Sequence, residues 1–124
     1  MSVDERLQVI TRLERDRAVL ELHGELDLAG APLLTSEIER AEGKAPRILV
    51  LDLEDLQFVD SAGLRVMLGA HQRSVERGAQ FALTPGTPQV QRLLAITGVT
   101  EHMQTIPSAD ETLLTGSGGP QAAA

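Results

Sequence analysis

One serine in this sequence occupies a position where its hydroxyl group could do chemistry. Ser61 follows Asp60 and precedes the small residues Ala62 and Gly63, between an apolar run and a second periodic segment. The apolar run predicts a buried strand and the second segment predicts a helix, so the serine is expected at the helix start. Such a position offers free backbone N–H groups and the positive end of the helix dipole, which favour a phosphate. Ser61 could therefore be a nucleophile, a phosphate acceptor or a helix cap.

A nucleophilic Ser61 would need a nearby base and a suitable turn. The flanking residues do not form the Gly-x-Ser-x-Gly turn of serine hydrolases. His71 lies roughly two turns or more further along the predicted helix, and His23 could approach only if its strand lay beside the helix start. His102 is the third histidine of the chain. We therefore expect no catalytic residue and no enzymatic activity.

Acidic side chains near predicted strand ends raise the possibility of a metal site. They are Glu25, Asp27, Asp52, Asp55 and Asp60. Carboxylates that follow strands can converge on a cation, but acids at such places also cap helices or form a solvated rim. We favour the second interpretation. The glycines form neither a phosphate-binding G-x-x-x-x-G-K-S/T loop nor a dinucleotide fingerprint, so we expect no metal and no cofactor.

The composition narrows the class of protein. The chain has 124 residues, a formal net charge of −7, and no cysteine. Its basic residues are scattered, whereas a nucleic-acid binder needs them clustered. No apolar run approaches the roughly 20 residues of a membrane helix, and the charged N-terminus lacks the apolar core of a signal peptide. We expect a cytoplasmic protein that binds neither nucleic acid nor membrane.

The apolar periodicity predicts a single α/β domain. Two alternating runs around a polar break indicate a β-hairpin, and the elements alternate between helix and strand after it. We expect a mixed sheet of four to five strands with about four helices packed on it. The expected strands are 7–13, 18–23, 47–53, 79–83 and 103–106, and the expected helices are about 30–42, 61–77, 87–98 and a short one from 107 that carries Leu113 and Leu114. On the second helix, Leu64, Met67, Leu68, His71 and Val75 are expected to line one side.

Two motifs in this arrangement resemble the signature of the STAS family, and in particular bacterial anti-sigma factor antagonists (anti-anti-sigma factors). One is the stretch Leu53–Leu64, which contains Asp60-Ser61-Ala62-Gly63, and the other is Gly24-Glu25-Leu26-Asp27 after the hairpin. The resemblance covers about residues 5–115 with the elements in the same order. It implies a STAS-like domain at 1–115, followed by a Gly/Ser/Ala-rich tail at 116–124 that we expect to be disordered.

The resemblance implies a partner-switching cycle in which Ser61 is the phosphorylated serine. An unphosphorylated antagonist binds an anti-sigma factor that is also a serine kinase, which releases the sigma factor. The kinase then phosphorylates the antagonist, and a metal-dependent serine phosphatase reverses the modification. Family members often carry Ser or Thr where this chain has Ala62, which removes a competing acceptor. The residues expected to contact the partner are Glu25, Asp27, Asp60, Ser61, Ala62 and Gly63.

The resemblance also leads to expectations for individual side chains near Ser61. Gly63 is expected to let a partner approach the loop, and Phe58 and Val59 are expected to anchor it in the core. Asp27 is expected to lie near Asp60.

An alternative function is a non-phosphorylated scaffold subunit of a stress-sensing or lipid-trafficking complex, in which Ser61 would serve as a helix cap.

Overall fold

The computed structural model of this protein describes residues 6–110, apart from the side chain of Thr100. The elements in chain order are β1 (Leu7–Glu14), β2 (Arg17–Leu26), α1 (Ala31–Glu42), β3 (Ile48–Val59), α2 (Ser61–Glu76), β4 (Gln80–Leu83), α3 (Pro88–Thr97), a 3₁₀ turn η1 (Val99–Glu101) and β5 (Gln104–Thr105).

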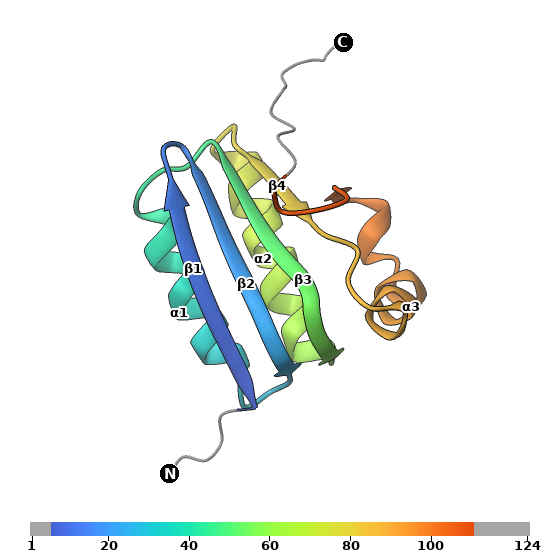
Figure 1. Ribbon diagram of the computed structural model, residues 1–124. Helices are drawn as coiled ribbons and strands as arrows, with labels where there is room; N and C mark the ends of the chain where they lie inside the picture. The colour runs from blue at the N-terminus through green and yellow to red at the C-terminus, as the bar shows by residue number, and fades with distance from the viewer. Residues whose placement is uncertain (1–5, 111–124) are drawn as a thin grey trace.

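Five strands form one mixed sheet in the order β1-β2-β3-β4-β5 (Figure 1). β1 and β2 are antiparallel and form the expected hairpin, with Glu14 paired to Arg17 across a two-residue turn. Arg15 in this turn has a positive φ of 52°, a conformation that tight hairpin turns require. The other neighbouring strands are parallel, so each of those connections crosses over through a helix or helical turn.

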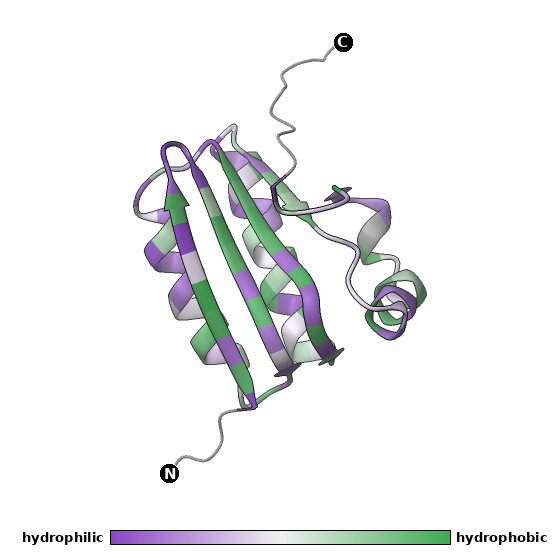
Figure 2. Cartoon of the chain, in the orientation of Figure 1, coloured by the Kyte–Doolittle hydropathy of each residue, from purple (hydrophilic) through white to green (hydrophobic). Residues whose placement is uncertain are grey.

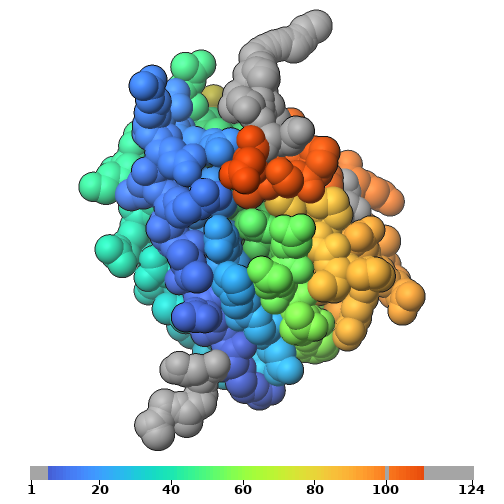
Figure 3. Space-filling model, in the orientation of Figure 1, coloured from blue at the N-terminus to red at the C-terminus, as the bar shows by residue number. Residues whose placement is uncertain are grey.

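α1 and α2 cover one face of the sheet and bury the main core against it, and α3 lies beside the β4 end, where Val90 and Leu94 join the same core (Figure 1). In the central strand β3, consecutive residues 48–51 are all buried, as expected for a strand covered on both sides. The second face carries a smaller apolar cluster, consisting of Val19, Ile48, Val50, Ala82, Ile106 and Ala109. Residues 106–110, which follow β5, cover this smaller cluster (Figure 3). Polar residues recur along the remainder of β1, β2 and β3 (Figure 2).

β3 is longer than the apolar run predicted. It continues beyond Leu53 to Val59 and stays paired with β2, where Leu56 aligns with Gly24 and Val59 with Leu26. The pairing is interrupted by two register shifts in this region, which fit the longer β3 to β2. The stretch that leads to Ser61 is therefore a paired strand rather than a loop.

The expected apolar side of α2 needs correction. On α2, Leu68 and Val75 are 40% and 60% exposed, and the buried positions include the small residues Gly63, Ala70 and Ser74. These small side chains let the helix lie close to its neighbours, which turns the larger residues outward.

The structure shows three α-helices within residues 6–110. The fourth helix and the 116–124 tail were expected largely or wholly in residues outside that range.

Candidate functional site

Asp60 organises the junction between β3 and α2. It is the N-cap residue of α2, and its Oδ1 accepts hydrogen bonds from the backbone N–H groups of Ala62 at 2.9 Å and Gly63 at 3.1 Å. These two bonds satisfy amides that a helix start otherwise leaves without a partner. Asp60, and not Ser61, is therefore the cap of this helix.

The same carboxylate also fixes the loop between β2 and α1. Oδ2 of Asp60 accepts a hydrogen bond from the backbone N–H of Leu28 at 3.1 Å, and the Asp60 N–H donates to the carbonyl of Leu26 at 3.1 Å. In the same loop, Oδ1 of Asp27 accepts bonds from the N–H groups of Ala29 and Gly30 at 3.1 and 3.2 Å. The two sequence motifs thus meet in space, with Asp27 and Asp60 on adjoining loops.

Ser61 is the first residue of α2, and its side chain is free. The residue is exposed, and within residues 6–110 its hydroxyl group makes no hydrogen bond. A serine hydroxyl that neither caps a helix nor supports the packing is available to a second macromolecule. Ser61 is therefore accessible at the start of α2.

One part of the expected phosphate chemistry is wrong. The sequence suggested free N–H groups at this helix start, but Asp60 already occupies those of Ala62 and Gly63. A phosphate on Ser61 would gain the favourable helix dipole and would stand beside the Asp60 carboxylate, which repels it. Binding to those two amides would require Asp60 to leave them.

Gly63 packs inward. A Cβ at this position would lie 2.6 Å from Cγ of Leu26 and 2.9 Å from Cγ2 of Val59, distances that no real side chain tolerates without a shift. The structure therefore gives Gly63 a packing role in place of the open approach that the sequence suggested. Ala62 is also largely buried, at 9% exposure, so neither residue presents much side chain to a partner.

The two residues expected to anchor the loop behave differently. Val59 is 2% exposed and belongs to the core, as expected, whereas Phe58 is 37% exposed. The expectation for Phe58 was wrong because neighbouring residues of a strand point to opposite faces. Leu28, in the loop bound by Asp60, is 74% exposed. Two large apolar side chains are thus accessible on segments that adjoin Asp60.

The charges around the junction are mostly negative, with two cations near by. Arg6 forms ion pairs with Oε1 of Glu25 at 3.1 Å and Oδ2 of Asp27 at 3.4 Å. Arg65 lies four residues after Ser61 on α2, is exposed, and has no ion pair within residues 6–110. Sequence reasoning missed both arginines, although the i, i+4 spacing of Ser61 and Arg65 was a readable signal.

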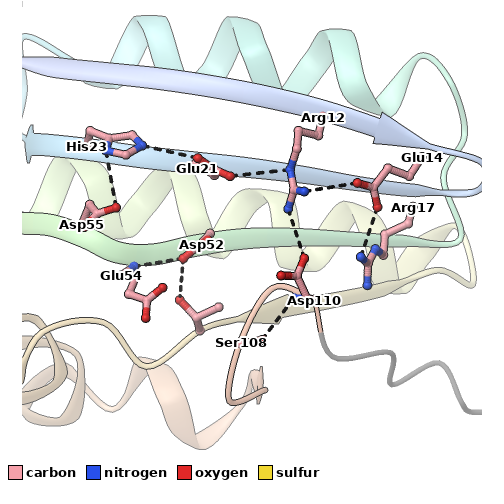
Figure 4. Close-up of polar contacts among 11 residues, drawn as sticks. Arg12, Glu14, Arg17, Glu21, His23, Asp52, Glu54, Asp55, Ser108 and Asp110 are labelled. Carbon is pink, nitrogen blue, oxygen red and sulfur yellow. Dashed lines mark hydrogen bonds and ion pairs between the residues drawn. The ribbon is translucent and has the colours of Figure 1, made fainter.

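The remaining acids, Asp52 and Asp55, and His23 lie elsewhere. On the face of the sheet opposite the helices, Nε2 of His23 lies 3.5 Å from Glu21, and its Nδ1 lies 3.6 Å from Asp55 (Figure 4). Oδ1 of Asp52 accepts bonds from the Thr84 hydroxyl and the Glu54 N–H (Figure 4). Glu25 and Asp27 contact Arg6 instead.

No histidine in the described range contacts Ser61. His71 stacks edge-on against Phe81, with ring centroids 5.8 Å apart, and His102 is an exposed residue after η1. Over residues 6–110, no group of three or more acidic or histidine side chains is arranged to hold a metal ion. In the same range, no helix has the length and apolar character needed to cross a membrane.

A family model and the curated relatives of this chain indicate the same family. Residues 8–112 match the STAS domain family. The chain is 32% identical over 98 residues to the anti-sigma F factor antagonist of Paenibacillus polymyxa, covering 78% of this chain and 84% of that protein.

Solved structures show the same fold. A crystal structure of an anti-sigma factor antagonist from Mycobacterium paratuberculosis superposes with a TM-score of 0.79 at 22% identity, covering 93% of this chain and 97% of that one. The Bacillus cell fate determinant SpoIIAA in its phosphorylated form has a TM-score of 0.64 at 22% identity, with 88% and 96% coverage.

Proposed function

Because the chain belongs to the STAS domain family and to its anti-sigma factor antagonists, we propose that phosphorylation of Ser61 switches its binding to an anti-sigma factor. Family membership confirms the resemblance found in the sequence, and anti-sigma factor antagonists are regulators rather than enzymes. The observation that supports the switch is the exposed, unbonded hydroxyl of Ser61 beside the capping carboxylate of Asp60. The unphosphorylated chain binds an anti-sigma factor that is also a serine kinase, in the cytoplasm, and so releases the sigma factor.

Phosphate on Ser61 acts through charge at the contact surface. It adds about −1.5 to −2 charges and three acceptor oxygens next to Asp60, with Asp27 on the adjoining loop. A partner that docks on Leu28, Phe58 and Ser61 would have to desolvate this group or face it with its own acids. A loss of about 3 kcal/mol in binding corresponds to more than a hundredfold in affinity, which is sufficient for a switch.

The fold itself is expected to change little on phosphorylation. The hydroxyl of Ser61 makes no bond that phosphate would break, and the cap of α2 belongs to Asp60. The helix dipole favours the added charge by about 0.3–1 kcal/mol, which offsets repulsion from Asp60. A metal-dependent phosphatase can therefore reach the same exposed group and reverse the switch.

The test is partner capture from a lysate of the native host, with Ser61→Ala and Ser61→Asp chains as baits and mass spectrometry as the readout. We expect an ATP-binding anti-sigma kinase on the Ser61→Ala bait and at least about a hundredfold weaker binding to Ser61→Asp in a titration with that purified kinase. Because aspartate is an incomplete mimic, a chain carrying phosphoserine at 61 serves as the matched third bait.

Equal capture of one large complex by all three baits would contradict the switch. That outcome would favour the non-phosphorylated scaffold subunit, in which the chain is held in an assembly whatever the state of Ser61.

A further inference from the structure

The two edges of the sheet differ in how they are protected. The edge at β5 is only two residues long, and a short edge offers little backbone for another chain to pair with. The edge at β1 is eight residues long, and its pairing with β2 is unbroken from Leu7 to Glu14. It contains no Pro, Gly or Lys, so it lacks the bulges, prolines and lysines that usually blunt an exposed edge.

The outer backbone groups of β1 belong to alternate residues. The carbonyl of Arg6 accepts the N–H of Glu25 at 2.8 Å and so faces β2. By strand alternation, the backbone groups of the even-numbered residues face β2, and those of Leu7, Val9, Thr11 and Leu13 face outward. Within residues 6–110, no backbone hydrogen bond reaches this outer edge.

We propose that the outer edge of β1 pairs with β1 of a second copy of this chain, antiparallel and with Ile10 opposite Ile10 on the two-fold axis. In this register Leu7 lies opposite Leu13, and Arg6 lies opposite Glu14, twice in each dimer. Ile10 and Leu13 are accessible in the single chain, at 42% and 50% exposure, whereas Leu7 is 6% exposed and belongs to the main core. The side chains of Arg6 and Glu14 are 59% and 42% exposed. Each already takes part in ion pairs within the chain, so the contact between copies would be added to these or exchanged for them.

Neighbouring registers that keep the same faces together are less complementary. Centring the axis on Val9 would place Arg6 opposite Arg12, and like charges across a strand pair destabilise it. Centring it on Thr11 would place the charged Arg12 opposite the apolar Ile10. If one chain moved along the other by a single residue, side chains on the helix-covered face of one chain would lie beside side chains on the open face of the other. The Ile10 register also lets the outward groups form about eight backbone hydrogen bonds, and the two sheets then join into one.

Sedimentation equilibrium over a dilution series tests the association with the full chain. We expect a mass twice that of the monomer at high concentration, and a single-chain mass at every concentration would overturn the proposal. Ile10→Lys places two like charges on the axis and should give a monomer, whereas Val75→Lys, at an exposed position on α2, should still form the dimer. Circular dichroism checks that both variants are folded.

Disulfide formation tests the register. The chain contains no cysteine, and directly opposed residues at a non-hydrogen-bonded pair have Cβ atoms about 4.5–5.5 Å apart, close enough for a disulfide after a small adjustment. Under mild oxidation, Ile10→Cys should cross-link at least about tenfold faster than Val9→Cys or Thr11→Cys. Faster cross-linking at either neighbour would contradict the register, and equal rates at all three would contradict specific pairing. None of these readouts involves Ser61, so they are independent of the proposed switch.

Discussion

The β3–α2 and β4–α3 junctions each join a parallel strand to the helix that follows it, and they use their hydroxyl groups in opposite ways. At the β4–α3 junction, Thr84 is 2% exposed, and its hydroxyl group accepts the Leu53 N–H at 2.7 Å and donates to Asp52 at 3.2 Å. Thr87 caps α3 by accepting the Val90 N–H at 3.2 Å. At the β3–α2 junction an aspartate performs the capping, and the hydroxyl of Ser61 is left exposed.

This difference fits the proposed switch at the β3–α2 junction and a structural role for the β4–α3 junction. A carboxylate cap supplies both oxygens to the structure, to α2 and to the Leu28 loop, so the adjacent serine is not needed for folding. A threonine cap leaves no spare hydroxyl. Chemical modification of Ser61 therefore adds a group without removing a bond, whereas modification of Thr84 would require its strand contacts to open.

The largest contrast is expected in the free energy of unfolding. Thr84→Val should destabilise the chain by about 1–3 kcal/mol, because it leaves the buried N–H of Leu53 without its acceptor. Ser61→Ala should change stability by no more than about 0.5 kcal/mol. Urea denaturation followed by circular dichroism measures both. Similar losses for the two variants would mean that Ser61 contributes to the fold after all.

Substitution of the cap itself should have an intermediate effect. Asp60→Ala removes the acceptor for two helix amides and for Leu28, and we expect a loss of about 1–2 kcal/mol. Asp60→Asn keeps a capping oxygen and should retain most of that stability, which makes it the matched control. Thr87→Ala, at the other junction, should cost about 1 kcal/mol. A destabilisation by Asp60→Asn as large as that by Asp60→Ala would show that charge rather than capping dominates at this position.

The smallest effect concerns Arg65 in the phosphorylated state. Residues four apart on a helix are neighbours, and an anion N-terminal to a cation is the favourable order. With phosphoserine incorporated at 61, Arg65→Ala should lower stability by about 0.3–0.5 kcal/mol more than it does in the unmodified chain. Arg65→Lys keeps the positive charge and should therefore retain most of the stabilisation that Arg65→Ala removes. Thermal melts of the wild type and both variants, each with and without phosphoserine at 61, would detect it at low and high salt, and an equal loss in both phosphorylation states would exclude the pairing.

Much of the architecture could be predicted because local patterns agreed with the final packing. The alternating runs around residues 14–17 specify a hairpin, and the apolar run at 48–51 specifies a buried central strand. The extension of β3 to Val59 could not be predicted from hydropathy, because Glu54 and Asp55 interrupt the apolar pattern. Two register shifts against β2 accompany the continued pairing of that segment.

At the site, the sequence predicted where α2 begins but not whether Asp60 or Ser61 caps it. Asp and Ser are both good capping residues and stand side by side at 60 and 61, so propensity alone could not say which one caps. The outward position of Phe58 and the contact between Asp60 and the Leu28 loop depend on where β2 and β3 end together. Those are tertiary facts, and no local pattern encodes them.

The most direct test of the central claim is to locate phosphate on the chain purified from its native host. Peptide mapping by mass spectrometry would compare the wild-type chain with Ser61→Ala and with Thr87→Ala, which alters the hydroxyl at the other junction. We expect phosphate on Ser61 in the wild-type and Thr87→Ala chains and none in Ser61→Ala. Phosphate that persists in Ser61→Ala, or that maps to Thr84 or Thr87, would contradict the assignment of Ser61 as the regulated hydroxyl.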